Sequence, residues 1–392
     1  MARKQLLLLF TAFCAVSAQF PPYVEDCRHG TYPPADAPYR PVNVPTYQIN
    51  LDLPGEKRWT ELATDKAQEM RDLIAVIKSL VNSFSGGLII DIVDRDLPKL
   101  MSGLPDIAVA EMTGIAQASG VPLGEVYLYN LFYEFNALCT SIVSEDPSGE
   151  IYHARNMDFG LFMGWDVHND TWLLTEKLRP LVVNVEFTKN NQTVFKGVNF
   201  VGYIGIITGM KPQKFSLTVN ERYSLKGSGL AGILKWILGT HTGNWMGFLT
   251  RTVFETVDTF SDAKNILSTK QLIGPIYFIL GGVESGEGAV ITRAADKALD
   301  IWNLNITNNT WYILETNYDH WKKPLFIDDR RTPAMKCMNT MGRANATLPN
   351  IFDVLNTKPV LNKLTAYTTL MHVKTGQMET YLRYCSDPCW PW

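Results

Sequence analysis

The sequence changes character around Cys139-Thr140-Ser141-Ile142-Val143, which is followed by His153-Ala154-Arg155-Asn156-Met157-Asp158. Residues before Cys139 show the apolar spacing of helices, whereas short runs with strand character dominate after it. Arg155 and Asp158 fall on the next predicted strand. A cysteine at this boundary, with an arginine and an aspartate nearby, suggests an enzyme whose nucleophile is released by cleavage of its own chain.

The N-terminal residues have the features of a secretory signal. Met1-Ala2-Arg3-Lys4 is basic, residues 6–13 are mostly apolar, and small residues lead to Ala18, after which we expect cleavage. No later run reaches the roughly 18 apolar residues that a membrane span needs. Glycosylation sequons support export, and their asparagines are Asn169, Asn191, Asn305, Asn308 and Asn345. Secretion and delivery to the lysosome both fit these features.

The composition argues against nucleic-acid and metal binding. The formal net charge is −3 at pH 7, and the sequence has no basic run or aromatic–basic stripe that would bind nucleic acid. The histidines and cysteines lack convincing metal-ligand spacing, so we expect neither a metal nor a cofactor. At 392 residues the chain is long enough for one large domain or two.

The cysteine count predicts one free thiol. Removal of the signal removes Cys14 and leaves Cys27, Cys139, Cys337, Cys385 and Cys389. An odd number in an oxidising compartment means that one thiol is free or pairs between molecules. A local bridge within the last pair is plausible, and the first and third cysteines could then join the two ends of the chain. Cys139 would remain free.

The apolar patterns predict a layered α+β architecture, because helices flank antiparallel strands. An extended arm held by Cys27 covers residues 19–47. Helical spacing is found at 59–84, 89–97, after Pro105, at 123–138, 229–238 and 245–257. Strand-like runs are found at 151–157, 181–188, 193–201, 215–220, 289–293, 299–304 and 310–316.

The residues around Cys139 allow two interpretations. Positive charge from Arg155 could populate the thiolate, the nucleophilic form of cysteine, and Asp158 could hold the arginine and orient an amine. Residues three apart on a strand face opposite sides, so both reach one site only if Asp158 lies beyond the strand end, where Phe159-Gly160 permits a turn. The alternative is a buried, inert cysteine beside a structural Arg–Asp pair. These residues alone favour neither.

Histidine would be the usual partner of a catalytic thiol. The six histidines are His29, His153, His168, His241, His320 and His372. None lies in a context typical of a thiol protease. His153 is the best candidate because it faces the same side of its strand as Arg155, although a surface or structural role is favoured for all six.

Longer stretches carry a resemblance to a known family. The stretches 139–143, 153–160, 316–319 and 328–332 closely resemble the acid ceramidases, N-terminal-nucleophile amidohydrolases related to N-acylethanolamine-hydrolysing acid amidase. The similarity extends from the Cys27 arm to the C-terminal cysteines. The acid amidase shares Cys-Thr-Ser-Ile-Val, but residues 48–53 and 361–364 favour the ceramidases.

The resemblance implies an αββα four-layer sandwich and a precursor that cleaves itself between Leu138 and Cys139. The expected segments are a signal peptide at 1–18, a helical α subunit at 19–138 and a catalytic β subunit at 139–392, with the subunits remaining associated. The new α-amine of Cys139 would then act as general base for its own thiol, so no histidine is required.

The resemblance also implies roles for residues outside the cysteine stretch. Arg155 and Asp158 would position nucleophile and substrate, Asn317 would donate to the oxyanion, and Arg330 would bind polar groups or order the site. A further site residue is expected at Glu221 or at its neighbour Asn220. Without the resemblance, turn residues and surface ion pairs would be the simpler interpretation.

The implied substrate is ceramide, cleaved at its amide bond to sphingosine and a fatty acid in the lysosome lumen. The apolar residues at 233–238 and 245–248 could line a channel for its hydrocarbon chains or belong to an ordinary core. The implied partners are a saposin-type activator and anionic lysosomal membranes. The alternatives are an acid amidase for N-acylethanolamines and a lipid-binding glycoprotein without catalytic activity.

Overall fold

The structure is a computed structural model that describes residues 23–33, 44–85, 101, 103–132, 137–159, 164–223 and 243–389. Several predicted features lie outside these residues. They are the signal peptide, the helices at 89–97 and 229–238, the turn residue Gly160, and His241.

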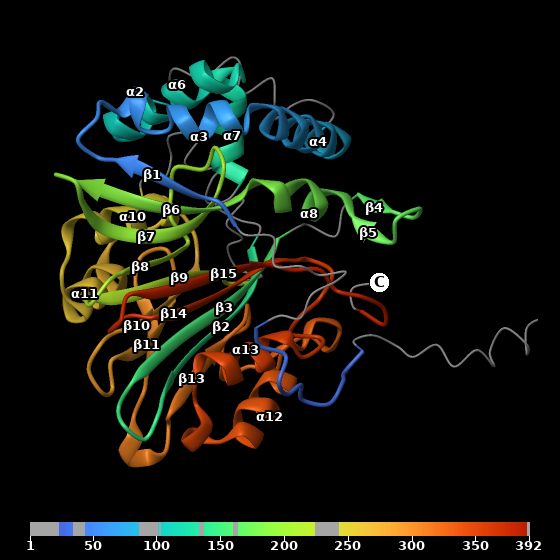
Figure 1. The fold of residues 1–392 in the computed structure, drawn as a ribbon, viewed down its shortest axis with the longest axis vertical. Helices are drawn as coiled ribbons and strands as arrows, with labels where there is room; N and C mark the ends of the chain where they lie inside the picture. The colour runs from blue at the N-terminus through green and yellow to red at the C-terminus, as the bar shows by residue number, and fades with distance from the viewer. Residues whose placement is uncertain are drawn as a thin grey trace, which may run out of the picture.

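Two β-sheets packed face to face form the centre of the molecule (Figure 1). The larger sheet has the order β1-β6-β7-β8-β9-β10-β11-β12 and the smaller β13-β2-β3-β14-β15. The larger sheet comprises β1 (Thr46–Asn50), β6 (Val182–Lys189), β7 (Gln192–Phe200), β8 (Thr208–Lys211), β9 (Phe215–Glu221), β10 (Ile276–Gly281), β11 (Gly288–Arg293) and β12 (Ala298–Asn303). The smaller comprises β13 (Tyr312–Glu315), β2 (Ala137–Glu145), β3 (Ile151–Phe159), β14 (Thr365–His372) and β15 (Gln377–Leu382). A separate hairpin is formed by β4 (Trp165–Asp166) and β5 (Thr171–Trp172).

Helices cover the outer face of each sheet. The larger sheet is covered by α10 (Met246–Thr256) and α11 (Phe260–Thr269), and the smaller by α12 (Arg331–Met341) and α13 (Leu348–Asn356). This arrangement confirms the predicted αββα sandwich. Short helices connect the layers: α8 (Leu173–Leu178), η1 (Arg179–Leu181), η2 (Ile306–Asn308), η3 (Phe326–Asp328) and η4 (Arg343–Asn345).

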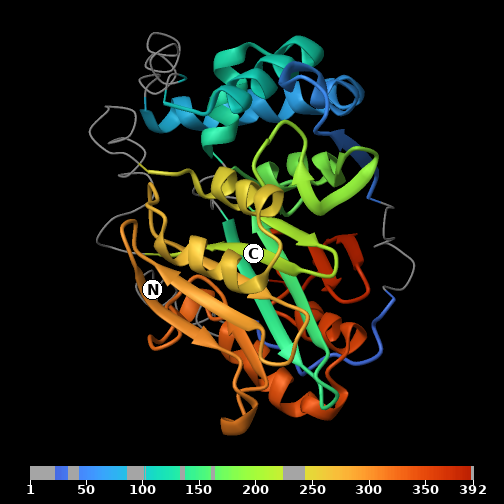
Figure 2. The same ribbon diagram turned by 90° about the vertical axis from the view of Figure 1, so that its left-hand side faces the viewer.

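The N-terminal helices form a separate layer at one end of the sandwich (Figures 1 and 2). They are α2 (Gly55–Arg58), α3 (Thr60–Asp65), α4 (Ala67–Ser85), α6 (Asp106–Ser119) and α7 (Leu123–Phe132). α2 crosses α6 so closely that a Cβ on Gly114 would lie 2.1 Å from the carbonyl oxygen of Glu56. Glycine is therefore required at this crossing.

A buried ion cluster and a strand join the N-terminal layer to the rest of the fold. Glu111 of α6 is fully buried and accepts hydrogen bonds from Trp59 Nε1 at 2.7 Å, Arg58 at 3.0 Å and Arg251 of α10 at 2.7 Å. Opposite charges with several hydrogen bonds can remain buried because each compensates the desolvation of the other. Beside this cluster, β1 adds to the larger sheet in parallel with β6.

The predicted change from helix to strand at Cys139 is wrong, because the strand begins earlier. β2 begins at Ala137, and α7 covers Leu123–Phe132 of the helix expected at 123–138. Ala137 pairs with Phe159 and Leu138 with Asp158, so the ladder with β3 continues through the expected cleavage site. Cross-strand hydrogen bonds outweigh the local helical pattern there.

The β2–β3 hairpin is set by its turn. The Asp146 carboxylate accepts hydrogen bonds from the backbone N–H groups of Ser148 at 2.8 Å and Glu150 at 3.0 Å, which is the behaviour expected of aspartate in a turn. Gly149 follows with φ +89°, a value that favours glycine. The turn fixes the register that places Cys139 opposite Met157.

Candidate active site

Cys139 lies near the start of β2, and its side chain points into the space between the two sheets. The residue is fully buried. Its sulfur lies 3.8 Å from Met157 Sδ and 3.8 Å from the carbonyl oxygen of Val219, which belongs to β9 of the other sheet. The nucleophile expected from the sequence therefore sits in the centre of the sandwich, where water has little access.

Arg155 supplies the positive charge expected beside the thiol. Its Nη2 contacts Cys139 Sγ, and its Nη1 donates to the carbonyl oxygen of Ile207 at 2.9 Å and to Thr208 Oγ1 at 2.8 Å. Burial raises the pKa of the Cys139 thiol to about 11, although Arg155 opposes this shift. In the uncleaved chain the thiol is therefore protonated, and a base is needed to form the thiolate.

Asp158 does not hold Arg155, contrary to the sequence expectation. It lies inside β3, three residues after Arg155, and so faces the other side of the sheet. Its ionic partner is Arg330, at 3.2 Å. Asn362 Nδ2 at 3.1 Å and Thr365 Oγ1 at 2.6 Å donate to its two oxygens. Arg155 thus contacts the Cys139 sulfur from one face of the sheet, whereas Asp158 binds Arg330 on the other face.

Arg330 connects Asp158 to the backbone of the cysteine. Its Nη1 donates to the carbonyl oxygen of Cys139 at 2.6 Å, and its Nη2 donates to Asn317 Oδ1 at 2.7 Å. The Asp328 carboxylate accepts from Nε at 2.9 Å and from Nη2 at 3.1 Å. A guanidinium can serve these acceptors together because its donors form a rigid planar fork. Arg330 therefore lies at the centre of the candidate site, and its role in catalysis stays a prediction.

Asn317 faces the nitrogen of Cys139. Its Oδ1 accepts from the Cys139 backbone N–H at 3.0 Å as well as from Arg330, so two donors identify this atom as the oxygen. Its Nδ2 donates to the carbonyl oxygen of Glu221 at 2.8 Å.

The side chains of the neighbours Asn220 and Glu221 have different surroundings. Asn220 accepts from Ser141 Oγ at 2.9 Å and donates to the carbonyl oxygens of Glu315 and Thr316 at 3.0 Å each, so it braces the chain that leads to Asn317. Burial raises the pKa of Glu221 to about 8, so its carboxyl is uncharged at acidic pH. A role of either neighbour in catalysis stays a prediction.

His153 has a structural position away from the thiol. Its ring nitrogens bind Ser216 Oγ at 2.8 Å and Thr218 Oγ1 at 3.0 Å, and Thr218 donates in turn to Ser141. Burial and the charge of Arg155 lower the pKa of His153 to about 3. A neutral imidazole held by two hydroxyl groups supports a structural role for this residue.

The cysteines outside the site are joined in two disulfides. Cys27 bonds to Cys337 and Cys385 to Cys389, and Cys139 is the free cysteine among the described residues. This is the pairing that the cysteine count suggested. Among the described residues there is no group of three or more His, Cys, Asp or Glu side chains that could hold a metal ion. In the same part of the chain, no helix is long and apolar enough to cross a membrane.

The asparagines of the sequons share one property, which is that all are exposed. They are Asn169, Asn191, Asn305, Asn308 and Asn345. A folded protein accommodates a glycan only on an exposed asparagine, so glycosylation at these positions remains a prediction that the fold permits.

Comparison with known proteins agrees with this geometry. Residues 139–385 match the linear amide C–N hydrolases of the choloylglycine hydrolase family, and residues 42–104 match the β subunit of N-acylethanolamine-hydrolyzing acid amidase. The chain is 52% identical over 393 aligned residues to the acid ceramidase of Macaca fascicularis, covering 100% of this chain and 99% of the relative. It is 51% identical to the acid ceramidase of Homo sapiens, covering 99% and 98%.

A solved structure is also similar. The Caenorhabditis elegans ortholog of N-acylethanolamine-hydrolyzing acid amidase aligns with a TM-score of 0.53 and 32% identity, covering 62% of this chain and 100% of that one. The family match begins at Cys139, the residue on which Arg155, Arg330 and Asn317 converge. The chain therefore belongs to the choloylglycine hydrolase family of linear amide C–N hydrolases.

Proposed function

We propose that this amide hydrolase cleaves ceramide to sphingosine and a free fatty acid, after its chain has been cut between Leu138 and Cys139. The observation that carries the proposal is the convergence of three side chains on one residue. Arg155 contacts the Cys139 sulfur, Asn317 binds its nitrogen, and Arg330 binds its carbonyl oxygen. A site built around the nitrogen of a cysteine suits an enzyme that uses this nitrogen as a base.

The same atoms support self-cleavage. The Cys139 thiol would give up its proton and attack the carbonyl carbon of Leu138, and the acyl group would pass from nitrogen to sulfur as the nitrogen gains a proton. Water would then hydrolyse the thioester and leave a carboxylate on Leu138 and a free α-amine on Cys139. A free α-amine titrates near pH ~8, and burial beside Arg155 would lower this value towards an acidic working range.

Ceramide hydrolysis would repeat this chemistry on an external amide. The α-amine takes the thiol proton, the thiolate attacks the amide carbon, and the side-chain amide of Asn317 would stabilise the resulting oxyanion. The protonated amine then passes its proton to the departing sphingosine nitrogen. Water hydrolyses the thioester and releases the fatty acid. Asp158 and Arg330 would hold the cysteine backbone throughout, and Glu221, uncharged below its pKa of about 8, would border the thiol.

The two chains formed by cleavage would remain together. We assign residues 19–138 to a helical α subunit and 139–392 to a catalytic β subunit. The Cys27–Cys337 disulfide would link them covalently, while the β1–β6 pairing and the buried Glu111–Arg251 ion pair would hold the helical layer on the sandwich. Removal of a signal peptide at 1–18 and delivery to the lysosome lumen belong to the same proposal.

An exposed apolar loop supports docking on anionic membranes. Trp321, Leu325, Phe326 and Ile327 are 50%, 60%, 68% and 56% exposed, within seven residues of chain that also include Lys322 and Lys323. Apolar side chains beside lysines suit a negatively charged lipid surface. The loop lies between Asn317 and Arg330 in the chain, so docking would bring lipid close to the site. A saposin-type activator would help to extract the substrate.

The match of residues 42–104 makes an acid amidase for N-acylethanolamines the second candidate. A comparison of two substrates distinguishes it from the proposed ceramidase. The purified enzyme is incubated at acidic pH with a short-chain ceramide and, separately, with an N-acylethanolamine. Preferential release of sphingosine, abolished in Cys139→Ala, is the expected result. Preferential release of ethanolamine would support the second candidate. Lipid binding without hydrolysis of either substrate would instead indicate a lipid-binding glycoprotein.

A further inference from the structure

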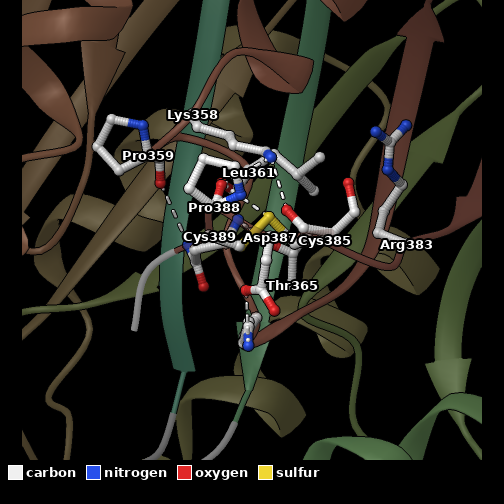
Figure 3. The surroundings of a disulfide bond; sticks show 12 residues. Lys358, Pro359, Leu361, Thr365, Arg383, Cys385, Asp387, Pro388 and Cys389 are labelled. Carbon is white, nitrogen blue, oxygen red and sulfur yellow. Dashed lines mark hydrogen bonds and ion pairs between the residues drawn. A yellow bond between two sulfur atoms is a disulfide. The ribbon is translucent and has the colours of Figure 1, made fainter. Parts of the chain in front are cut away.

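The C-terminal end of the described chain forms a small ring closed by the Cys385–Cys389 disulfide (Figure 3). Lys358, which is 4% exposed, points its ammonium group at this ring. Its Nζ donates to the carbonyl oxygens of Ser386 at 2.6 Å and Pro388 at 2.8 Å. A buried ammonium needs such acceptors, and the closed ring makes two of them converge on one nitrogen.

A second buried lysine binds the same ring. Lys363 is 5% exposed, and its Nζ lies 2.9 Å from the Asp387 carboxylate and also contacts the carboxylate of Asp170. The sulfur of Cys385 lies 3.7 Å from the carbonyl oxygen of Leu361. The ring therefore contacts the segment 358–365 at three positions along its length, and Figure 3 shows Lys358, Leu361 and Thr365 around the disulfide.

The segment 358–365 also carries the groups that orient Asp158. Asn362 Nδ2 and Thr365 Oγ1 donate to its carboxylate, and the Asn362 backbone N–H donates to Thr365 Oγ1 at 3.0 Å. The two donors are thus fixed relative to each other. Lys363 lies between them in the sequence and connects them to the ring through Asp387.

We propose that the Cys385–Cys389 ring is a positioning element for the catalytic centre, which acts by holding Lys358 and Lys363 and thereby the two donors to Asp158. The inference rests on the proposed function, because it assumes that Asp158 contributes to catalysis through Arg330. Asp158 binds Arg330 and Arg330 binds the Cys139 carbonyl oxygen, so a displaced segment would misplace the nucleophile. Displacements of about 1 Å can lower a rate roughly 100-fold.

The size of the ring supports this role over a general stabilising role. A disulfide restricts the unfolded chain more as the loop that it closes lengthens. Cys385 and Cys389 are separated by four positions, whereas Cys27 and Cys337 are separated by 310. The short ring therefore restricts the unfolded chain less than the long loop does, and the feature that distinguishes it is its contact with two buried lysines.

The test compares an enzyme whose ring is opened with an enzyme that has lost the contact between Lys358 and the ring. Cys385→Ser/Cys389→Ser opens the ring, Lys358→Met removes the ammonium, and a third variant combines the changes. Lys336→Met is the matched control, because Lys336 is a lysine 62% exposed that pairs with Asp26 away from the ring. The rate constant kcat and KM are measured on fully cleaved enzyme with a short-chain ceramide.

We expect ring opening and Lys358→Met each to lower kcat about tenfold, with KM changed less than twofold. The combined variant should be no slower than either alone, because both changes act through one contact. Lys336→Met should match the wild type. An unchanged kcat after ring opening, or multiplied effects in the combined variant, would overturn the proposal.

Two further variants keep the result interpretable. If the ring-opened chain is not secreted, Lys358→Met and Asp387→Asn are measured with the disulfide intact, and a wild-type kcat in both overturns the proposal. Asp158→Asn separates this inference from the proposed function. Full activity in Asp158→Asn would refute the proposed role of Asp158 itself, whereas loss of activity there beside a fully active ring-opened enzyme would refute only the positioning role.

Discussion

Replacing Arg330 by lysine keeps the positive charge but removes the planar fork of hydrogen-bond donors. The charge beside Asp158 is retained, but one ammonium cannot span Asp328 on one side and both Cys139 O and Asn317 on the other. We expect one of the two charge-assisted hydrogen bonds on the site side to be lost. Such a bond contributes about 1.5–3 kcal/mol, so kcat/KM should fall roughly 10- to 150-fold.

Arg331→Lys is the matched control for this experiment. Arg331 is the next residue and is also buried, but its donors bind the backbone carbonyl oxygens of Tyr318 at 3.0 Å and Asp319 at 3.1 Å rather than the site. Both variants should lower the melting temperature, whereas Arg330→Lys alone should lower kcat/KM for a short-chain ceramide. Equal activity in the two variants, at equal extents of chain cleavage, would refute the role assigned to Arg330.

Two further predictions concern stability. Burial raises the pKa of Glu315 to about 8 from an ordinary value of 4.5. Folding therefore favours the protonated acid. The contribution of this group to the free energy of unfolding is fully present below about pH 4.5 and is lost as the pH rises to about 8. Glu315→Gln, neutral throughout, should flatten this decline of the melting temperature, and an unchanged pH profile would contradict the assignment. Glu111→Gln leaves Arg251 and Arg58 without their buried anion and should lower the free energy of unfolding by about 3–5 kcal/mol. Urea unfolding measures this loss, and a change below about 1 kcal/mol would show that the cluster does not anchor the N-terminal layer.

Much of the sandwich could be predicted from apolar periodicity. The strands expected at 151–157, 193–201 and 215–220 appear as β3, β7 and β9 with small changes at their ends. The start of β2 could not be predicted, because residues 123–138 have helical spacing and only pairing with β3 makes residues 137 and 138 extended. Register between distant strands is a tertiary property that a local pattern does not contain.

Part of the candidate site could likewise be predicted from the sequence, and part could not. Cys139 and Arg155 could be paired from the sequence because they lie on neighbouring strands of one hairpin. The partner of Asp158 could not be predicted, because Arg330 is 172 residues away and reaches Asp158 from the start of α12. The contacts of Asn362 and Thr365 with Asp158 could not be predicted either, because Asn362 entered only as part of the stretch 361–364 and Thr365 was missed. The signal for Thr365 is positional, since it pairs with Asp158 at the start of β14, beside a bulge.

The proposed mechanism depends on Cys139 becoming an N-terminal residue. Intact-mass measurement and N-terminal sequencing of the purified protein, before and after incubation at acidic pH, test it most directly. We expect two disulfide-linked chains, one of them beginning at Cys139, to appear as activity rises, and we expect neither cleavage nor activity in Cys139→Ala. A fully active preparation in which Leu138 and Cys139 remain joined would contradict the account.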